Sequence, residues 1–258
     1  MRLGHRCGEL IMGGFDGPQP PPELLQRLRA GHLGGVILFA RNIVEPLQVA
    51  ELCAELRAAA GERRLLIAVD QEGGRVQRLR APLPRWPPMA TLGARDDLEL
   101  TRAVGRGIGS DLHTLGFDVD FAPVLDVVDN AENTVIADRA FGADAELVTR
   151  HGLALAGGLG DANIIGCAKH FPGHGGPVAD SHHELPHDER PRKALEAQDL
   201  LPFVAAARAR VPMMMVAHVV YPALLGPDEG AVPATFSRQI CTTLARETSG
   251  FAGLLCSY

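Results

Sequence analysis

The segment 169–186, KHFPGHGGPVADSHHELP, concentrates four histidines, a lysine and two acidic residues between glycines and prolines. This composition is compatible with a metal site, a catalytic loop or a polar surface loop. His170 and His174 have an H-x3-H spacing, but Pro172 and Gly173 interrupt any helix that would align the two imidazoles on one metal ion. We therefore expect no metal here, and the surface loop remains the alternative to a catalytic one.

Asp180 and His182 are the pair in this segment that suits acid/base chemistry. In an extended chain, residues i and i+2 point to the same side, so the Asp180 carboxylate can reach the His182 imidazole. A carboxylate in that place selects one imidazole tautomer and raises the pKa of the ring, which gives a general acid/base near neutral pH. The glycines of the preceding GHGG provide points at which such a loop can hinge.

A second group of polar residues follows an apolar run in AVDQEGGRVQRLR, 68–80. Asp70 ends the run, and Arg78 follows a Gly-Gly turn. A carboxylate accepts hydrogen bonds from neighbouring hydroxyls and an arginine donates two in parallel, which suits a sugar ring. The alternative is an ordinary strand–helix loop with a surface ion pair. In the next polar stretch, 118–142, Arg139 is a single loop arginine and indicates only solvation when taken alone.

Short apolar runs alternate with longer amphipathic segments along the whole chain. The runs are continuous rather than alternating in polarity, which is typical of strands buried on both faces of a parallel sheet. The predicted strands are 9–14, 34–39, 65–70, 118–127, 164–171, 213–220 and 252–257. The predicted helices are 22–30, 46–60, 97–115, 144–160, 191–209 and 237–249. This repetition predicts βαβ units and an α/β fold.

Two architectures fit this pattern, an open doubly wound sheet and a (β/α)8 barrel. The only glycine-rich candidate for a dinucleotide site, GRGIGS at 105–110, lies inside a helical pattern and follows no strand. Polar residues instead follow several different strands, as expected when all strand ends meet on one face of a barrel. They are Asp70, Asp126, Lys169, His170 and His218. We therefore predict a single TIM-type barrel domain over 1–258, truncated after its seventh strand and C-terminally incomplete.

Composition and charge exclude several classes of protein. The chain is 46% hydrophobic and 22% charged, with a formal net charge of −6 and no basic stripe, so nucleic acid is not an expected partner. The five cysteines are scattered, which predicts free thiols in a reducing compartment. No run approaches the roughly 20 apolar residues needed to cross a membrane. These features predict a cytoplasmic protein without a membrane partner.

Four stretches together resemble the family 3 glycoside hydrolases, and within them the bacterial single-domain β-N-acetylhexosaminidases. They are DQEGGRVQR at 70–78, DFAPVLDV at 120–127, KHFPGHG at 169–175 and DSH at 180–182. The resemblance extends from about residue 9 to 257. It implies a (β/α)8 barrel, no cofactor, no metal, and a small carbohydrate partner containing N-acetylglucosamine, such as a muropeptide fragment. It gives no indication of the oligomeric state.

The resemblance also implies roles for individual residues. His182 would be the acid/base of a retaining hydrolysis, oriented by Asp180. Sugar-binding residues would be Asp70, Arg78, Arg139, Lys169 and His170. The remaining histidines of this region are expected to be solvated loop residues; they are His174, His183 and His187.

The sequence departs from the family at one position. The family has a nucleophilic Asp directly after the seventh strand, and this chain has Tyr258 there. Three interpretations of the function therefore remain open. The protein is a β-N-acetylhexosaminidase, a truncated and catalytically impaired sugar-binding remnant, or a family 3 β-glucosidase or phosphorylase.

Overall fold

The computed structural model describes residues 7–130, 132–176 and 185–257. Within them, seven strands form one parallel sheet in the order β1-β2-β3-β6-β7-β8-β9. Their bounds are β1 Met12–Gly13, β2 Gly35–Leu38, β3 Leu66–Val69, β6 Val119–Asp120, β7 Ile165–Phe171, β8 Met213–Val216 and β9 Leu254–Cys256. A separate two-stranded ribbon, β4 (Gln71–Gly73) and β5 (Val76–Gln77), follows β3 directly.

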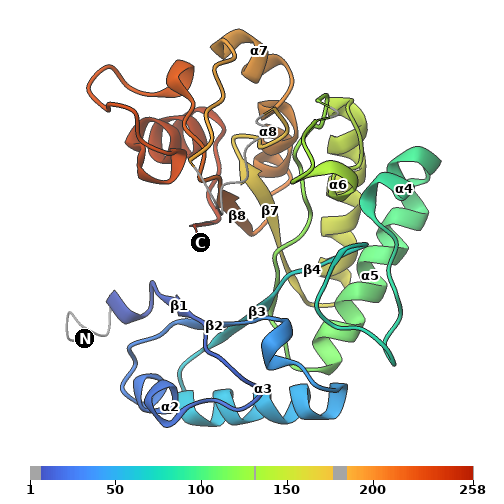
Figure 1. The fold of residues 1–258 in the computed structure, drawn as a ribbon, viewed down its shortest axis with the longest axis vertical. Coiled ribbons are helices and arrows are strands. Elements are labelled where there is room, and N and C mark those ends of the chain that lie inside the picture. The colour runs from blue at the N-terminus through green and yellow to red at the C-terminus, as the bar shows by residue number, and fades with distance from the viewer. Residues whose placement is uncertain (1–6, 131, 177–184, 258) are drawn as a thin grey trace.

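The helices lie on the outer side of the sheet, which curls into a partial barrel (Figure 1). The longer helices are α2 Pro22–Arg29, α3 Pro46–Ala60, α4 Met89–Arg95, α5 Leu98–Thr114, α6 Ala145–Asp161, α7 Arg192–Ala197, α8 Leu200–Arg208 and η5 Gln239–Thr248. Single 3-10 turns are η1 Ala40–Asn42, η2 Ala137–Arg139, η3 Pro222–Leu224 and η4 Ala234–Phe236. Each crossover between neighbouring parallel strands therefore passes over the same convex face, as in βαβ units.

Local sequence explains where the long helices begin and end. Asp97 caps α5 by accepting from the backbone N–H of Leu100 at 2.9 Å, and Asp144 caps α6 through Leu147 at 2.7 Å. Each cap satisfies a donor that the first helical turn leaves unpaired. Gly61 ends α3 with a positive φ of 67°, a conformation that glycine adopts without steric cost.

The interior of the curled sheet forms its own apolar cluster, distinct from the contacts between sheet and helices. Its buried members are Ala68, Val119, Phe121, Cys167, Met213 and Met215. These side chains come from alternate positions on or directly after β3, β6, β7 and β8, and they point into the barrel interior.

The predicted α/β barrel fold is confirmed, with seven strands in the described part of the chain. All seven strand patterns and all six helix patterns correspond to observed elements. Several details differ, including the β4–β5 ribbon, which was not predicted. The strand predicted over 118–127 keeps only Val119–Asp120 as a regular strand, the helix predicted over 191–209 divides into α7 and α8, and α4 was not predicted. In the described residues, no helix combines the length and the apolar character that crossing a bilayer requires.

Candidate active site

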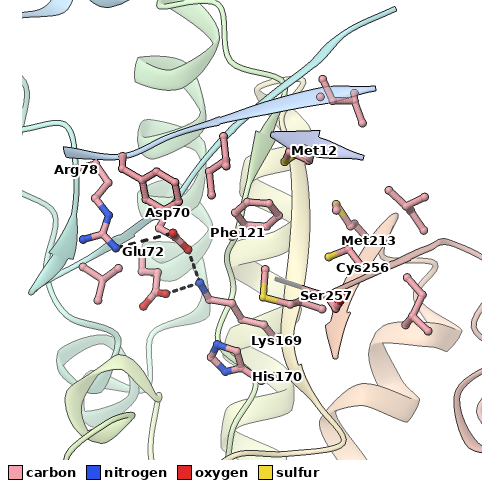
Figure 2. A pocket seen from close by; sticks show the side chains of 18 of the residues that line it. Met12, Asp70, Glu72, Arg78, Phe121, Lys169, His170, Met213, Cys256 and Ser257 are labelled. Carbon is pink, nitrogen blue, oxygen red and sulfur yellow. Dashed lines mark hydrogen bonds and ion pairs between the residues drawn. The ribbon is translucent and has the colours of Figure 1, made fainter. Parts of the chain in front are cut away.

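Lys169 lies at the centre of a buried ion network at the carboxyl ends of the strands. It projects from β7 and places its Nζ 2.8 Å from Asp70 Oδ1 and 2.5 Å from Glu72 Oε1. Asp70 follows β3 directly and Glu72 lies on β4. Both contact Lys169 on β7, which is about 100 residues further along the chain (Figure 2). The Lys169 side chain is 2% exposed, which makes these contacts effective in a low-dielectric environment.

Two arginines extend the network. Arg139, from η2, binds Glu72 through two hydrogen bonds of 2.8 Å, one from Nε to Oε2 and one from Nη2 to Oε1. Arg78 lies further away, with its Nη2 3.9 Å from Asp70 Oδ2. Glu72 therefore uses both carboxylate oxygens on Arg139 and Lys169, whereas Asp70 keeps one oxygen on the open side of the network.

The network keeps its members charged despite their burial. Burial alone would raise the pKa of Glu72, but the positive charges of Lys169 and Arg139 outweigh it and lower this pKa to about 2. Burial would likewise lower the pKa of Lys169, but Asp70 and Glu72 together raise it above its usual value. At neutral pH Glu72 and Lys169 therefore both remain charged inside the site.

His170 is fixed by Asp126 beneath the network. Its Nδ1 lies 2.7 Å from Asp126 Oδ2, and Asp126 Oδ1 accepts from the backbone N–H of His170 at 3.1 Å. Because an ionised carboxylate only accepts, Nδ1 carries the proton and Nε2 of the neutral ring acts as an acceptor. Burial lowers the pKa of His170 to about 4 against the opposing effect of Asp126, so the ring is neutral near pH 7.

His174 does not lie in solvent, and the expectation of a solvated loop histidine is wrong for it. Its residue exposure is 2%, and its ring meets that of His170 edge-on with centroids 5.9 Å apart. Its backbone N–H donates to Asp126 Oδ1 at 2.7 Å, which pulls the loop inward. Among the described residues, neither ring nitrogen has a hydrogen-bond partner. His187 is exposed, as predicted.

Asp120 is a further buried carboxyl next to the network. It accepts from the backbone N–H of Gln71 at 2.9 Å, while its Oδ2 has no hydrogen-bond partner within the described residues. Burial raises its pKa well above the usual value, and the negative charges of Asp70 and Glu72 add to this rise, although the hydrogen bond from Gln71 and the charge of Lys169 oppose it. Asp118, two residues before it, accepts from Arg57 at 2.8 Å and is not part of this network.

The five predicted sugar-binding residues line one pocket of about 720 Å³ at this end of the barrel; they are Asp70, Arg78, Arg139, Lys169 and His170. The structure therefore brings together side chains from four separate parts of the sequence. Such a concave site with a few converging polar groups is typical of a small-molecule site. Their individual roles in binding sugar stay predictions.

The predicted acid/base pair, Asp180 and His182, lies outside the described residues, as do His183 and Tyr258. The structure does describe what flanks this segment. Arg190 donates to Asp188 and, at 2.8 Å, to Asp199. A Cβ added to Gly176 would lie 2.5–2.8 Å from the Arg190 guanidinium, so the chain on one side of the segment packs against an ion cluster on the other side.

The carboxylates of the polar network are already paired with protein cations. Within the described ranges, no group of three or more His, Cys, Asp or Glu side chains is arranged to hold a metal. The carboxylates of Asp70 and Glu72 are already paired with Lys169 and Arg139, which occupy the places that a cation would take.

Two residues of the site were not predicted as functional, Glu72 and Asp126. Both stand in the quoted motifs, two positions after Asp70 and at the end of DFAPVLD. Each binds other protein side chains rather than facing the open pocket with a free oxygen. Their signal in the sequence was an acidic residue directly after an apolar strand, which also describes many ordinary loops.

A parallel barrel with buried ion pairs at the carboxyl ends of its strands defines the class of (β/α)-barrel enzymes that bind polar small molecules. The chain belongs to glycosyl hydrolase family 3, because the model of the N-terminal domain of this family matches residues 3–257.

Curated relatives carry the name β-hexosaminidase. The protein from Thiobacillus denitrificans is 44% identical over 238 residues, which cover 90% of this chain and 64% of the relative. The protein from Chromobacterium violaceum is 42% identical, with 90% and 65% covered. The chain thus spans about two thirds of the length of these relatives.

Solved structures agree with this assignment. A family 3 β-N-acetylglucosaminidase from Paenibacillus is 40% identical with a TM-score of 0.95, and the match covers 100% of this chain and 49% of that one. NagZ from Neisseria gonorrhoeae, in complex with N-trifluoroacetyl-D-glucosamine, is 38% identical with a TM-score of 0.89, covering 96% and 74%. Similarity at this level supports both the fold and the family.

Proposed function

We propose that the protein is a retaining glycoside hydrolase that removes terminal β-linked N-acetylglucosamine from peptidoglycan-derived fragments. Membership of glycosyl hydrolase family 3 supports this proposal, as do relatives named β-hexosaminidase and β-N-acetylglucosaminidase. The observation that carries it is the ion network of Asp70, Glu72, Arg139 and Lys169 on the wall of the pocket.

The network has the donors and acceptors that a pyranose ring requires. Asp70 Oδ2 is free to accept from a sugar hydroxyl, because Lys169 occupies Oδ1 and Arg78 lies as far as 3.9 Å away. Lys169 and Arg78 can donate to ring hydroxyls or to the amide oxygen of an N-acetyl group. His170 is neutral and offers Nε2 as an acceptor. The sugar thus replaces water in a site whose charges are already oriented.

Acid/base catalysis is proposed for His182 with Asp180 as its orienting partner, on the sequence pattern alone. In a retaining mechanism, one group protonates the leaving oxygen while a carboxylate attacks the anomeric carbon, and water later hydrolyses the glycosyl-enzyme. An imidazole in the first role places no second negative charge beside the nucleophile. The family nucleophile corresponds to position 258, where this chain has Tyr.

This tyrosine favours a second candidate function, sugar binding without turnover. Two measurements on the 258-residue chain separate the candidates. The first is release of chromophore from an aryl N-acetyl-β-glucosaminide, with His182→Ala as control. The second is calorimetric titration with N-acetylglucosamine at up to roughly millimolar sugar, the range of typical KM values.

Release above the His182→Ala control supports the hydrolase. Binding without release supports the second candidate, and it should be lost in Asp70→Asn, because the neutral amide lacks the charge that holds Lys169. A flat titration together with no release contradicts both candidates. Rates compared with and without phosphate distinguish hydrolysis from phosphorolysis, because only a phosphorylase depends on phosphate as the acceptor.

A cytoplasmic location is part of the same proposal. All five cysteines are free, which suits a reducing compartment. Fractionation of cells that express the natural protein tests this location, and recovery from the medium or the periplasm contradicts it.

A further inference from the structure

The interior of the barrel contains an unusual concentration of sulfur that the proposed reaction does not use. Cys167 on β7 and Cys256 on β9 place their Sγ atoms 4.0 Å apart across the intervening strand β8. Met213 and Met215 project from β8 into the same inner cluster. Met213 is in register with Cys167, and Met215 is in register with Cys256. Each thiol therefore has a thioether-bearing residue beside it on the neighbouring strand.

The separation of the two thiols suits a single bridging cation. With metal–sulfur bonds of about 2.3 Å, a distance of 4.0 Å corresponds to an S–metal–S angle of about 120°. An angle of about 120° is expected for trigonal planar coordination, in which three ligands surround the metal in one plane. The third ligand is then a thioether from Met213 or Met215, since these side chains adjoin the two thiols along β8.

The surroundings select a soft cation. The sulfur group belongs to the inner apolar cluster, which includes Ala68, Val119 and Phe121, while the charged groups that act on Cys167 are Lys169 and Asp70. Hard cations require oxygen ligands, and zinc usually takes four nitrogen or thiolate ligands, whereas Cu(I) is satisfied by thiolate and thioether sulfur. Clusters of His, Cys, Asp and Glu alone do not reveal such a site, because one of its three ligands is a methionine thioether.

The sulfur group is reachable from solvent. Met213, Met215 and Cys256 all line the pocket of about 720 Å³, together with Met12 from β1 (Figure 2). Cys167 is fully buried behind them, and burial raises its pKa well above the usual value, so it is a thiol until a ligand displaces its proton. The less buried Cys256 can thus bind an incoming cation first. Cys167 then forms the second metal–sulfur bond from the interior of the barrel.

We propose that Cys167, Cys256 and a thioether of Met213 or Met215 form a binding site for a soft monovalent cation, Cu(I) in type. Two metal–sulfur bonds form to the cysteines while their two S–H protons pass to solvent, and the metal keeps its oxidation state. The site lies one inward position below Lys169 on β7, because Cys167 precedes it by two residues. It is independent of the proposed glycosidase activity.

Silver(I) is the probe for this site, because it is thiophilic and does not change oxidation state in air. The 258-residue chain is titrated with Ag(I) in chloride-free buffer, and stoichiometry is read by native mass spectrometry. Competition against a soluble thiol gives the affinity. Iodoacetamide labelling followed by peptide mapping then identifies which cysteines the metal protects. The same titration with Cu(I) under anaerobic conditions, against a Cu(I) chelator, tests the proposed ion directly.

The expected result is one tightly bound Ag(I) that protects Cys256 from alkylation. Cys256→Ser should weaken this binding by roughly 100-fold or more, above the 10- to 100-fold typical for loss of a supporting group. Cys7→Ser and Cys241→Ser are the matched controls, since these thiols lie outside the inner cluster. Both control variants should leave the affinity for the first equivalent of Ag(I) unchanged.

A double variant tests the thioether independently of the thiols. Met213→Leu with Met215→Leu conserves side-chain volume, so the fold should be retained, and thermal unfolding checks this. It should weaken Ag(I) binding by about 10- to 100-fold while both thiols remain. Unchanged affinity in Cys256→Ser, protection of Cys7 or Cys241 in place of Cys256, or unchanged affinity in the double methionine variant overturns the proposal.

Discussion

Lys169 and Glu72 form an ion pair with Nζ 2.5 Å from Oε1, and both side chains are only 2% exposed. The same Glu72 carboxylate also receives two hydrogen bonds from Arg139. One buried anion thus fixes two cations that reach the pocket from different elements, β7 and η2. Both oxygens of Glu72 bind these cations, and the oxygen that can accept from a ligand belongs to Asp70. The role of Glu72 is therefore to position Lys169 and Arg139.

The first prediction concerns the stability contributed by this anion. Glu72→Gln should lower the free energy of unfolding by about 3–5 kcal/mol, because Arg139 keeps its charge without its carboxylate partner and Lys169 keeps only Asp70. Urea unfolding followed by circular dichroism measures the change. The control is Asp138→Asn, which breaks the half-exposed ion pair with Arg75 and should cost at most about 1 kcal/mol. Equal losses in the two variants contradict a special role for Glu72.

The second prediction is a dependence of stability on pH caused by His170. Its pKa falls from 6.5 to about 4 on folding, so between these values the unfolded chain binds more protons than the native one. Stability from this group is therefore complete above pH 6.5 and is lost as the pH falls from 6.5 to 4. The full loss is about 3 kcal/mol, at 1.36 kcal/mol for each unit of pKa.

His170→Gln removes this titration and should flatten the curve of unfolding free energy against pH in that window. His187→Gln is the matched control, because His187 is exposed, and it should keep the slope of the parent protein. The measurement is urea unfolding at half-unit pH steps from 4 to 7. An unchanged slope in His170→Gln means that His170 is not a buried neutral imidazole.

The third prediction tests how closely α4 packs on the loop after Arg139. A Cβ added to Gly93 would lie 1.8 Å from the carbonyl oxygen of Phe141, and backbone on both sides leaves it little room to move. Gly93→Ala should therefore destabilise the protein by about 1–3 kcal/mol, as overpacked sites do. Thermal unfolding measures the effect.

Gly160→Ala is the matched control for that substitution. Gly160 is also helical, on α6, but a Cβ there would have nothing within 4 Å. The gain in helix propensity should then stabilise the protein by about 0.5–1 kcal/mol. We expect Gly93→Ala to lower the stability and Gly160→Ala to raise it. A stabilising effect of Gly93→Ala would show that the helix can shift away from Phe141.

The order of strands and helices could be predicted because continuous apolar runs are a local property of the sequence. The strand bounds were less predictable. Pro123 has no N–H to donate, so regular pairing of β6 stops at Asp120 although the apolar run continues. The division between α7 and α8 falls at Gln198, whose backbone leaves the helical region with φ −132°. Pro202, in the first turn of α8, accounts for this break, because a proline cannot donate to the carbonyl four residues earlier, that of Gln198, and its ring clashes with it in a continuous helix.

The environment of the site residues was harder to predict from the sequence than the order of strands and helices. Arg139 taken alone indicated a solvated loop, yet its side chain is 13% exposed and pairs with Glu72, 67 residues earlier. His174 stands among glycines, which suggested exposure, yet its backbone is held by Asp126 and Asn133. In both residues, burial is decided by a partner distant in the sequence. The side-chain type could therefore be read from the sequence, and its environment could not.

The contact between Gly176 and Arg190 has a practical consequence for protein engineering. Arg190 is held by Asp188 and Asp199, so its guanidinium cannot move away easily, and only glycine fits beside it at 176. The two positions form a fixed clamp whose geometry is set by the scaffold. Segments of other lengths and sequences could therefore be grafted between 176 and 185, which leaves Asp188 in place to hold Arg190 and makes this clamp a natural boundary for loop exchange among related proteins.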